Sequence, residues 1–226
     1  LPYARVQARN ISCTEIGGDF YDVVDTPEGL AVVITDVSGK GISAAIMATM
    51  IQGMLRSDLA ARLPLDQVAA AANRYFNQRE VGGKYATLVI LRLHTGGILE
   101  YINCGHIPPL LIRGGSVSRL PSDNVPIGLL RDIEYTAGRL ELARGDRILM
   151  VTDGVTEAAN AEEEFFGDER LEAAVQGESF HSVFAALDQF CAGTPFNDDC
   201  TVVELTYLGE AQSAVQERAS AAIAAD

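Results

Sequence analysis

Aspartates stand at the ends of several apolar, strand-like segments of this sequence. Asp19 lies within GGDFYD, Asp36 closes LAVVITD, Asp153 closes ILMVTD, and Asp198 and Asp199 precede CTVVEL. Carboxylate oxygens are the ligands that hard divalent cations such as Mg²⁺ and Mn²⁺ prefer. Acids gathered at one end of a sheet would therefore bind such ions.

Two of these acids are predicted to face each other. Residues 26–29 (TPEG) form a turn between the strand-like segments 20–25 and 30–35. If Asp25 and Leu30 flank this turn as partners, the same antiparallel register places Asp19 opposite Asp36. Directly opposed like charges are unfavourable, and two charges about 4 Å apart cost roughly 4 kcal/mol at an effective dielectric constant of 20. A cation or a proton must offset this repulsion.

Rival catalytic motifs are missing from the sequence. It contains no HExxH, no GxSxG and no GxGxxG, and SGKG at 38–41 fails as a phosphate loop because the required first Gly falls at Ile34 and Gly41 follows Lys40. The cysteines have neither zinc-site spacing nor the Cys-x₅-Arg spacing of thiol phosphatases; they are Cys13, Cys104, Cys191 and Cys200. Covalent nucleophiles have no support, and we expect reduced thiols.

Composition and net charge restrict the classes of molecule that this chain can bind. The 226 residues include 17 Lys plus Arg against 31 Asp plus Glu, a net charge of −14, and 48% are hydrophobic. Such a chain folds around one core, and its charge disfavours nucleic acid and anionic lipid, which both require basic surfaces. No apolar run approaches the ~18 residues of a membrane span. We expect a cytoplasmic protein with no nucleic-acid or membrane partner and, since the chain begins at Leu1, a longer parent protein.

The predicted elements group as an α+β fold. Strands are expected at 5–12, 20–25, 30–35, 85–94, 98–104, 109–113, 147–152 and 200–208, and helices at 43–59, 65–78, 167–175 and 179–191. Short glycine turns make the strands antiparallel, and the helices come in pairs between runs of strands. Residues 209–226 form an Ala-rich C-terminal tail to which we assign no chemistry.

Seven blocks together resemble one family. They are GGDFYD (17–22), DVSGKGISAA (36–45), YATL (85–88), NCGHIPPLL (103–111), VPIG (125–128), TDGVTEA (152–158) and DDCT (198–201). In this order they resemble the SpoIIE-type branch of the protein phosphatase 2C (PPM) superfamily, the metal-dependent serine/threonine phosphatases. The resemblance covers residues 1–208 and implies a β-sandwich of two antiparallel sheets flanked by helix pairs.

The resemblance also implies a set of site residues. Metal carboxylates fall at Asp19, Asp36, Asp153 and Asp198, with a further ligand from the backbone carbonyl of Val37. The adjacent candidates are Asp22, Glu157 and Asp199, which would either support the metal ligands or bind a third metal ion. The implied cofactor is Mn²⁺ or Mg²⁺, two ions per site, with a metal-bridging hydroxide that attacks phosphorus.

Two features depart from the animal branch. There a His follows the Asp-Gly dipeptide, whereas here Asp36 is followed by Val37 and Ser38. The phosphate-gripping Arg has no clear counterpart before Asp19, and Lys40 is a candidate on spatial grounds alone.

The leading hypothesis is a phosphoserine/phosphothreonine protein phosphatase. The resemblance implies a phosphorylated anti-sigma-factor antagonist of the STAS fold as substrate, in partner-switching regulation. An N-terminal sensory or regulatory domain in the longer protein and a homodimer are further expectations. The alternative is a catalytically silent PPM-fold binding module that signals by docking a partner, for which the Met47, Met50 and Met54 stripe is a candidate surface if it is not core. A metal-dependent nuclease conflicts with the negative charge.

Overall fold

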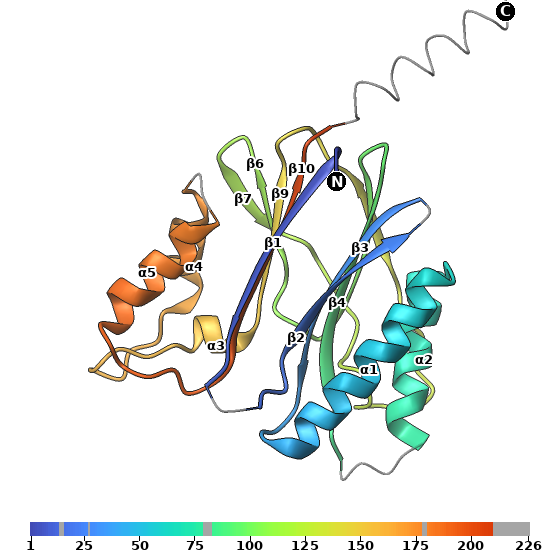
Figure 1. The fold of residues 1–226 in the computed structure, drawn as a ribbon, viewed down its shortest axis with the longest axis horizontal. Coiled ribbons are helices and arrows are strands. Elements are labelled where there is room, and N and C mark those ends of the chain that lie inside the picture. The colour runs from blue at the N-terminus through green and yellow to red at the C-terminus, as the bar shows by residue number, and fades with distance from the viewer. Residues whose placement is uncertain (14–15, 27, 79–82, 178–179, 210–226) are drawn as a thin grey trace, which may run out of the picture.

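Two five-stranded antiparallel sheets face each other in the computed structural model, which describes residues 1–13, 16–26, 28–78, 83–177 and 180–209 (Figure 1). In order across the first sheet, the strands are β1 (Ala4–Ile11), β10 (Cys200–Tyr207), β9 (Arg147–Val151), β6 (Leu110–Arg113) and β7 (Ser116–Arg119). Those of the second are β2 (Phe20–Thr26), β3 (Gly29–Val37), β4 (Ala86–His94), β5 (Ile98–Cys104) and β8 (Gly138–Glu141).

Helix pairs cover the outer face of each sheet. The helices α1 (Ile42–Ala60) and α2 (Leu65–Gln78) pack on the second sheet, and α4 (Gly167–Val175) and α5 (His181–Cys191) pack on the first (Figure 1). A short helix, α3 (Asp153–Thr156), directly follows β9. The predicted β-sandwich with flanking helix pairs is confirmed.

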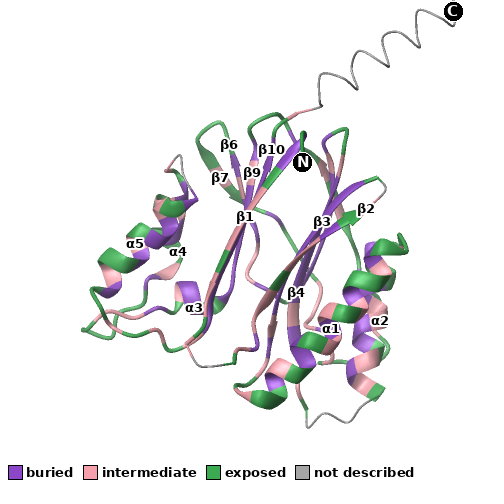
Figure 2. Cartoon of the chain, viewed as in Figure 1, coloured by how far each residue is buried: buried purple, intermediate pink, exposed green. Residues whose placement is uncertain are grey.

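The core has three apolar layers, one between the sheets and one beneath each helix pair. Between the sheets, Val32 and Ile34 of β3 belong to the same buried cluster as Met150 and Val203 of the opposite sheet. Central strands are buried on both faces, as the purple strands of Figure 2 show. Because strand side chains alternate between faces, Asp36 lies on the same face of β3 as Val32 and Ile34. The strand therefore directs this acid toward the opposite sheet.

The methionine stripe of α1 belongs to the core more than to the surface. Met47 is buried, and Met54 packs against the cluster beneath α1 and α2, while Met50 is partly exposed. The stripe therefore gives the binding-module alternative little support.

The predicted elements agree with the observed ones except for three four-residue elements, β7, β8 and α3, which sequence reasoning missed. Such elements are too short to show a periodicity. Residues 178–179, at the predicted start of the last helix, and 210–226 of the predicted tail lie outside the described residues. Among the helices that the structure describes, none combines the length and apolar character needed to cross a membrane.

Candidate metal centre

Asp19 and Asp36 approach each other at one end of the second sheet. The β2–β3 ladder pairs Asp25 with Leu30 and ends at Phe20 opposite Thr35, so the next pair along the same register is Asp19 and Asp36. Burial, the stronger cause, and the Asp36 charge raise the pKa of Asp19 to about 8. Burial and then the charges of other aspartates raise the pKa of Asp36 to about 6. The pair therefore retains a proton near neutral pH unless a cation replaces it.

The first sheet brings further acids to the same place. Asp153 begins α3 directly after β9, and Asp198 and Asp199 precede β10. The charges of Asp153, Asp198 and Asp199 all raise the pKa of Asp36, after burial. Burial and then Asp198 raise the pKa of Asp153. The predicted acids of the two sheets thus form one electrostatically coupled group, which we call the acidic cluster: Asp19, Asp36, Asp153, Asp198 and Asp199.

Hydrogen bonds orient three carboxylates of the acidic cluster. Thr201 Oγ1 donates to Asp19 Oδ2 (2.8 Å), and Asn10 Nδ2 donates to Thr201 Oγ1 (2.8 Å). The backbone N–H of Cys13 donates to Asp199 Oδ1 (2.9 Å), and that of Asp199 donates to Asp198 Oδ1 (2.9 Å). Sequence reasoning missed Asn10 as a supporting residue, because its bond to Thr201 crosses between β1 and β10 and follows only from their pairing.

The Gly17–Gly18 pair lets the chain pass close to this cluster. A Cβ at Gly17 would collide with the Asp199 carboxylate, and one at Gly18 would lie 2.8 Å from the Val37 carbonyl oxygen. Val37, the predicted backbone ligand, is fully buried at the end of β3. Its carbonyl thus lies against a backbone that has no room for a side chain.

Gly18→Ala is expected to weaken Mn²⁺ binding by about tenfold, because the added Cβ displaces the Val37 carbonyl. A tenfold loss of affinity corresponds to about 1.4 kcal/mol. Isothermal titration calorimetry of the chain measures this. The matched control is Gly53→Ala in α1, where a Cβ meets nothing within 4 Å. That control should keep the affinity for Mn²⁺ and gain about 0.5–1 kcal/mol in free energy of unfolding. Equal affinities in both variants would argue against a role for the Val37 carbonyl.

Of the predicted adjacent candidates, Asp22 faces away from the acidic cluster. Asp22 lies on the opposite face of β2 from Asp19, where Arg56 of α1 donates to its carboxylate (2.8 Å). Glu157 is exposed at the C-terminal end of α3, where its backbone N–H donates to the Asp153 carbonyl (2.7 Å). Asp199 is the candidate that the structure brings to the cluster.

His106 contacts a strand neighbour of Asp36. It is buried, its Nδ1 is 2.7 Å from Thr87 Oγ1, and Thr87 is the β4 partner of Asp36. Burial lowers the pKa of His106 to about 4, so the imidazole is neutral. The Asn103 side chain binds the His106 backbone. Its Nδ2 donates to the His106 carbonyl (3.0 Å), and its Oδ1 accepts from the His106 N–H (2.8 Å). These contacts give His106 a packing role in the turn after β5.

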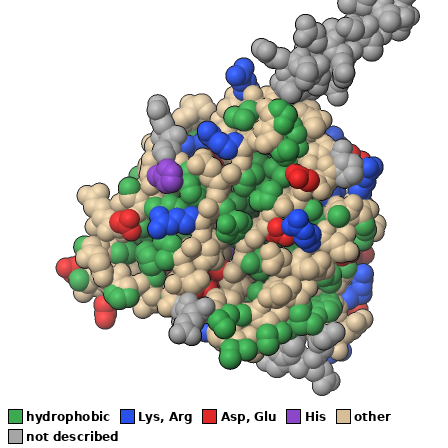
Figure 3. Space-filling view, in the orientation of Figure 1, with side chains coloured by type: hydrophobic (Ala, Val, Ile, Leu, Met, Phe, Trp, Pro, Cys, Tyr) green, Lys and Arg blue, Asp and Glu red, His purple; other side chains and the backbone are tan. Residues whose placement is uncertain are grey.

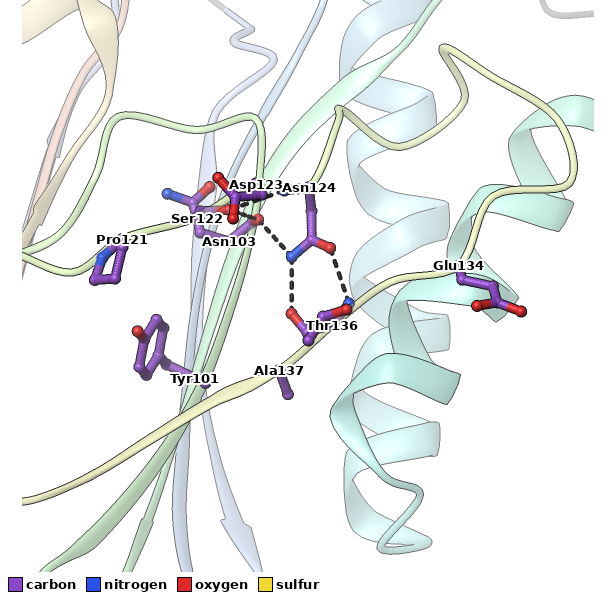
Figure 4. Close-up of a pocket in the computed structure, with 10 residues that line it drawn as sticks. Tyr101, Asn103, Pro121, Ser122, Asp123, Asn124, Glu134, Thr136 and Ala137 are labelled. Carbon is purple, nitrogen blue, oxygen red and sulfur yellow. Dashed lines mark hydrogen bonds between the residues drawn. The ribbon is translucent and has the colours of Figure 1, made fainter.

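A separate hollow of about 300 Å³ lies beside β5 and contains none of the predicted site residues (Figure 4). Asn124 holds its wall together by donating to the carbonyls of Asn103 (3.2 Å) and Thr136 (2.8 Å). Its acidic side chains are Asp123 and Glu134, and no Lys or Arg lines it. These contacts connect the 120–137 segment to β5.

The residues of the acidic cluster fit divalent cations. The cluster offers hard oxygen donors, and its half-buried Asp19–Asp36 pair holds a proton that a cation could replace. Of the Lys and Arg side chains that the structure describes, Lys40 forms the ion pair with this cluster, to Asp198 (2.9 Å). One exposed ammonium leaves most of the negative charge without a counter-ion.

The family model described as Stage II sporulation protein E (SpoIIE) matches residues 26–208. Protein IcfG of Synechocystis sp. is 28% identical over 186 residues, which are 69% of this chain and 29% of that protein. Phosphoserine phosphatase RsbP of Bacillus subtilis is 28% identical over 150 residues, which are 63% of this chain and 37% of that protein. The chain therefore spans less than half the length of these relatives.

Solved structures share the fold. The RsbU and RsbW domains of a Mycobacterium tuberculosis protein superpose with a TM-score of 0.76 at 26% identity, over 93% of this chain and 61% of that one. The catalytic domain of the serine/threonine phosphatase PstP, in complex with 2 manganese ions, gives a TM-score of 0.68 at 17% identity, over 91% of this chain and 99% of that one. This chain belongs to the SpoIIE family and has the fold of the PP2C phosphatase domains.

Proposed function

We propose that this domain hydrolyses phosphoserine and phosphothreonine in a protein substrate and that it needs Mn²⁺ or Mg²⁺ to do so. The observation that carries the proposal is the acidic cluster, because its carboxylates come from both sheets and meet without enough positive charge to balance them. Family membership and the manganese-bound neighbour of the same fold support it.

In this proposal Asp19, Asp36, Asp153 and Asp198 hold two divalent ions with help from the Val37 carbonyl. When bound, the ions supply Lewis-acid charge and an activated water for attack on phosphorus. The chain supplies the positioning: Thr201 orients Asp19, and the backbone N–H of Asp199 orients Asp198. The Cys13 thiol lies beside Asp198 and Asp199, but burial and then the Asp199 charge raise its pKa, which disfavours the nucleophilic thiolate. The proposed reaction is therefore direct hydrolysis without a phosphoenzyme.

Apolar side chains beside the cluster favour a protein substrate over a small phosphate ester. Ile42 (69% exposed) and Ile46 (54% exposed) lie on the first turns of α1, directly after the loop that carries Lys40. Ile16 (47% exposed) lies in the segment that precedes Asp19. Hydrophobic side chains gather along the lower edge of the face shown in Figure 3, over α1. Exposed apolar patches mark surfaces that contact other proteins.

Replacing Ile42 and Ile46 together by Ser is expected to lower kcat/KM for a phosphoprotein by about thirtyfold, because each buried apolar side chain contributes about 1 kcal/mol to binding and 1.4 kcal/mol is tenfold. Turnover of p-nitrophenyl phosphate, which is too small to reach both side chains, should stay within about twofold of wild type. Steady-state kinetics with both substrates give the ratio. An equal loss of kcat/KM with both substrates would mean that these residues support the acidic cluster instead of contacting a protein substrate.

A phosphorylated STAS-fold anti-sigma-factor antagonist is the substrate that we propose, with an N-terminal regulatory domain and a homodimer in the longer protein. The test offers the Mn²⁺-loaded chain phosphoserine, phosphothreonine and phosphotyrosine peptides of one sequence beside a phosphorylated STAS protein. Release from phosphoserine and phosphothreonine, and faster release from the STAS protein, is the expected result. Binding of the STAS phosphoprotein with no release from any substrate would favour the silent binding module.

A further inference from the structure

Lys40 occupies a distinctive place beside the acidic cluster. Its Nζ lies 2.9 Å from Asp198 Oδ2 and donates to the Asn197 carbonyl (2.6 Å). The side chain is nevertheless 55% exposed, so its ammonium faces both the carboxylates and solvent. A substrate phosphate that reaches the proposed metals must pass close to this charge.

The loop that carries Lys40 is anchored on several sides. Ser38 donates its backbone N–H to the Tyr85 carbonyl (2.9 Å) and accepts the Tyr85 N–H on Oγ (2.9 Å). Lys84 Nζ donates to the Ser38 carbonyl (3.0 Å). Gly39 and Gly41 on either side of Lys40 have φ of 89° and 79°, values that favour glycine. The backbone of Lys40 is therefore held while its side chain remains free to exchange partners.

The surrounding charge calls for a cation at this position. Among the Lys and Arg side chains that the structure describes, Lys40 forms the ion pair with the acidic cluster, so an approaching phosphate meets a balancing cation only beside Lys40. The N-terminus of α1 begins directly after Lys40, with Gly41 as its cap, no side-chain cap and no acidic residue in its first turn. Its free N–H groups add partial positive charge on the same side.

We infer that Lys40 is the residue that binds the substrate's phosphoryl group, by exchanging its bond to Asp198 for one to a phosphate oxygen. The inference rests on the proposed phosphatase function and supplies the cation that the sequence lacks before Asp19. Lysine binds phosphate as a point charge, so the contact needs only a reachable ammonium. Since Lys40 competes for Asp198, removing it should not weaken metal binding.

The test compares the 226-residue chain with Lys40→Gln, Lys40→Arg and the matched control Arg62→Gln, which removes an exposed cation that pairs with Glu28 (3.3 Å) at the other end of the β2–β3 hairpin. With Mn²⁺ saturating, calorimetry gives the dissociation constant of inorganic phosphate, and kinetics give KM for a phosphoserine peptide. For Lys40→Gln we expect both constants to rise about tenfold, the effect of losing a charge-assisted hydrogen bond. Both constants of Lys40→Arg should stay within about threefold of wild type, and those of Arg62→Gln should equal the wild-type values.

Electron paramagnetic resonance of Mn²⁺ without phosphate separates this role from metal support. Lys40→Gln should bind Mn²⁺ at least as tightly as wild type. Weaker Mn²⁺ binding in Lys40→Gln, or wild-type affinity of this variant for phosphate, would overturn the inference. If the proposed function is wrong, the wild-type chain would bind Mn²⁺ and phosphate but release no phosphate from any peptide. The affinities of the variants for phosphate would still test the role of Lys40.

Discussion

Replacing Asp36 by Asn should reduce metal-dependent phosphate release by about three orders of magnitude or more. Asp36 is electrostatically coupled to Asp19 in its own sheet and to Asp153 and Asp198 of the opposite one, so the amide removes charge from the centre of the cluster. A bound metal is worth several kcal/mol to a transition state, and each 1.36 kcal/mol is tenfold in rate. Steady-state phosphate release at several Mn²⁺ concentrations measures the loss.

The matched control is Asp25→Asn, which makes the same charge change at the other end of the β2–β3 hairpin, where Asp25 is exposed opposite Leu30. This control should keep wild-type turnover and Mn²⁺ affinity. Circular dichroism should show both variants folded. Turnover by Asp36→Asn at the rate of Asp25→Asn would contradict the assignment of Asp36 as a metal ligand.

The metal-free chain should lose stability as pH rises from about 4 to about 8. Burial raises the native pKa of Asp19 to about 8 and that of Asp36 to about 6, from an ordinary value of 3.8 for an aspartate. The native state therefore binds more protons than the unfolded state across this range, so the free energy of unfolding falls as pH rises. We expect these two groups to account for a fall on the order of 2 kcal/mol, less than the full shifts imply, because solvent reaches both carboxylates.

Urea unfolding with a chelator present, at pH 4, 6 and 8, measures this fall. Asp36→Asn isolates the contribution of the pair, because an amide neither titrates nor repels Asp19. The stability of this variant relative to wild type should increase with pH, and saturating Mn²⁺ should stabilise wild type much more than the variant. A difference between the two proteins that is constant with pH would mean that the carboxylates do not repel each other in the native state.

Local patterns were enough to predict most of the fold and the approach of the two cluster members that belong to the second sheet. The four-residue turn at 26–29 fixes the β2–β3 register, and that register alone predicts that Asp19 faces Asp36. The expected strands and helix pairs follow from apolar periodicity and glycine turns. The approach of Asp153 and Asp198 from the opposite sheet was implied by the family resemblance, because no local rule shows which strand ends meet across a sandwich.

What the sequence could not show are contacts made between elements. Asp22 is three residues from Asp19, but strand alternation turns it to Arg56 of α1, a partner 34 residues away. The bond from Lys40 to Asp198 spans two loops that only the closed sandwich brings together. Such contacts depend on how sheets and helices pack, which residue spacing along one strand does not encode.

The most direct test of the central claim is phosphate release from a phosphoserine peptide by the 226-residue chain across a Mn²⁺ titration, with a chelator blank. We expect no release in chelator, release that rises and saturates as Mn²⁺ fills the site, and a molar ratio of two bound Mn²⁺ ions per chain at saturation. Release that persists in chelator, or a chain that binds Mn²⁺ and remains inactive on every phosphoserine substrate, would contradict the claim.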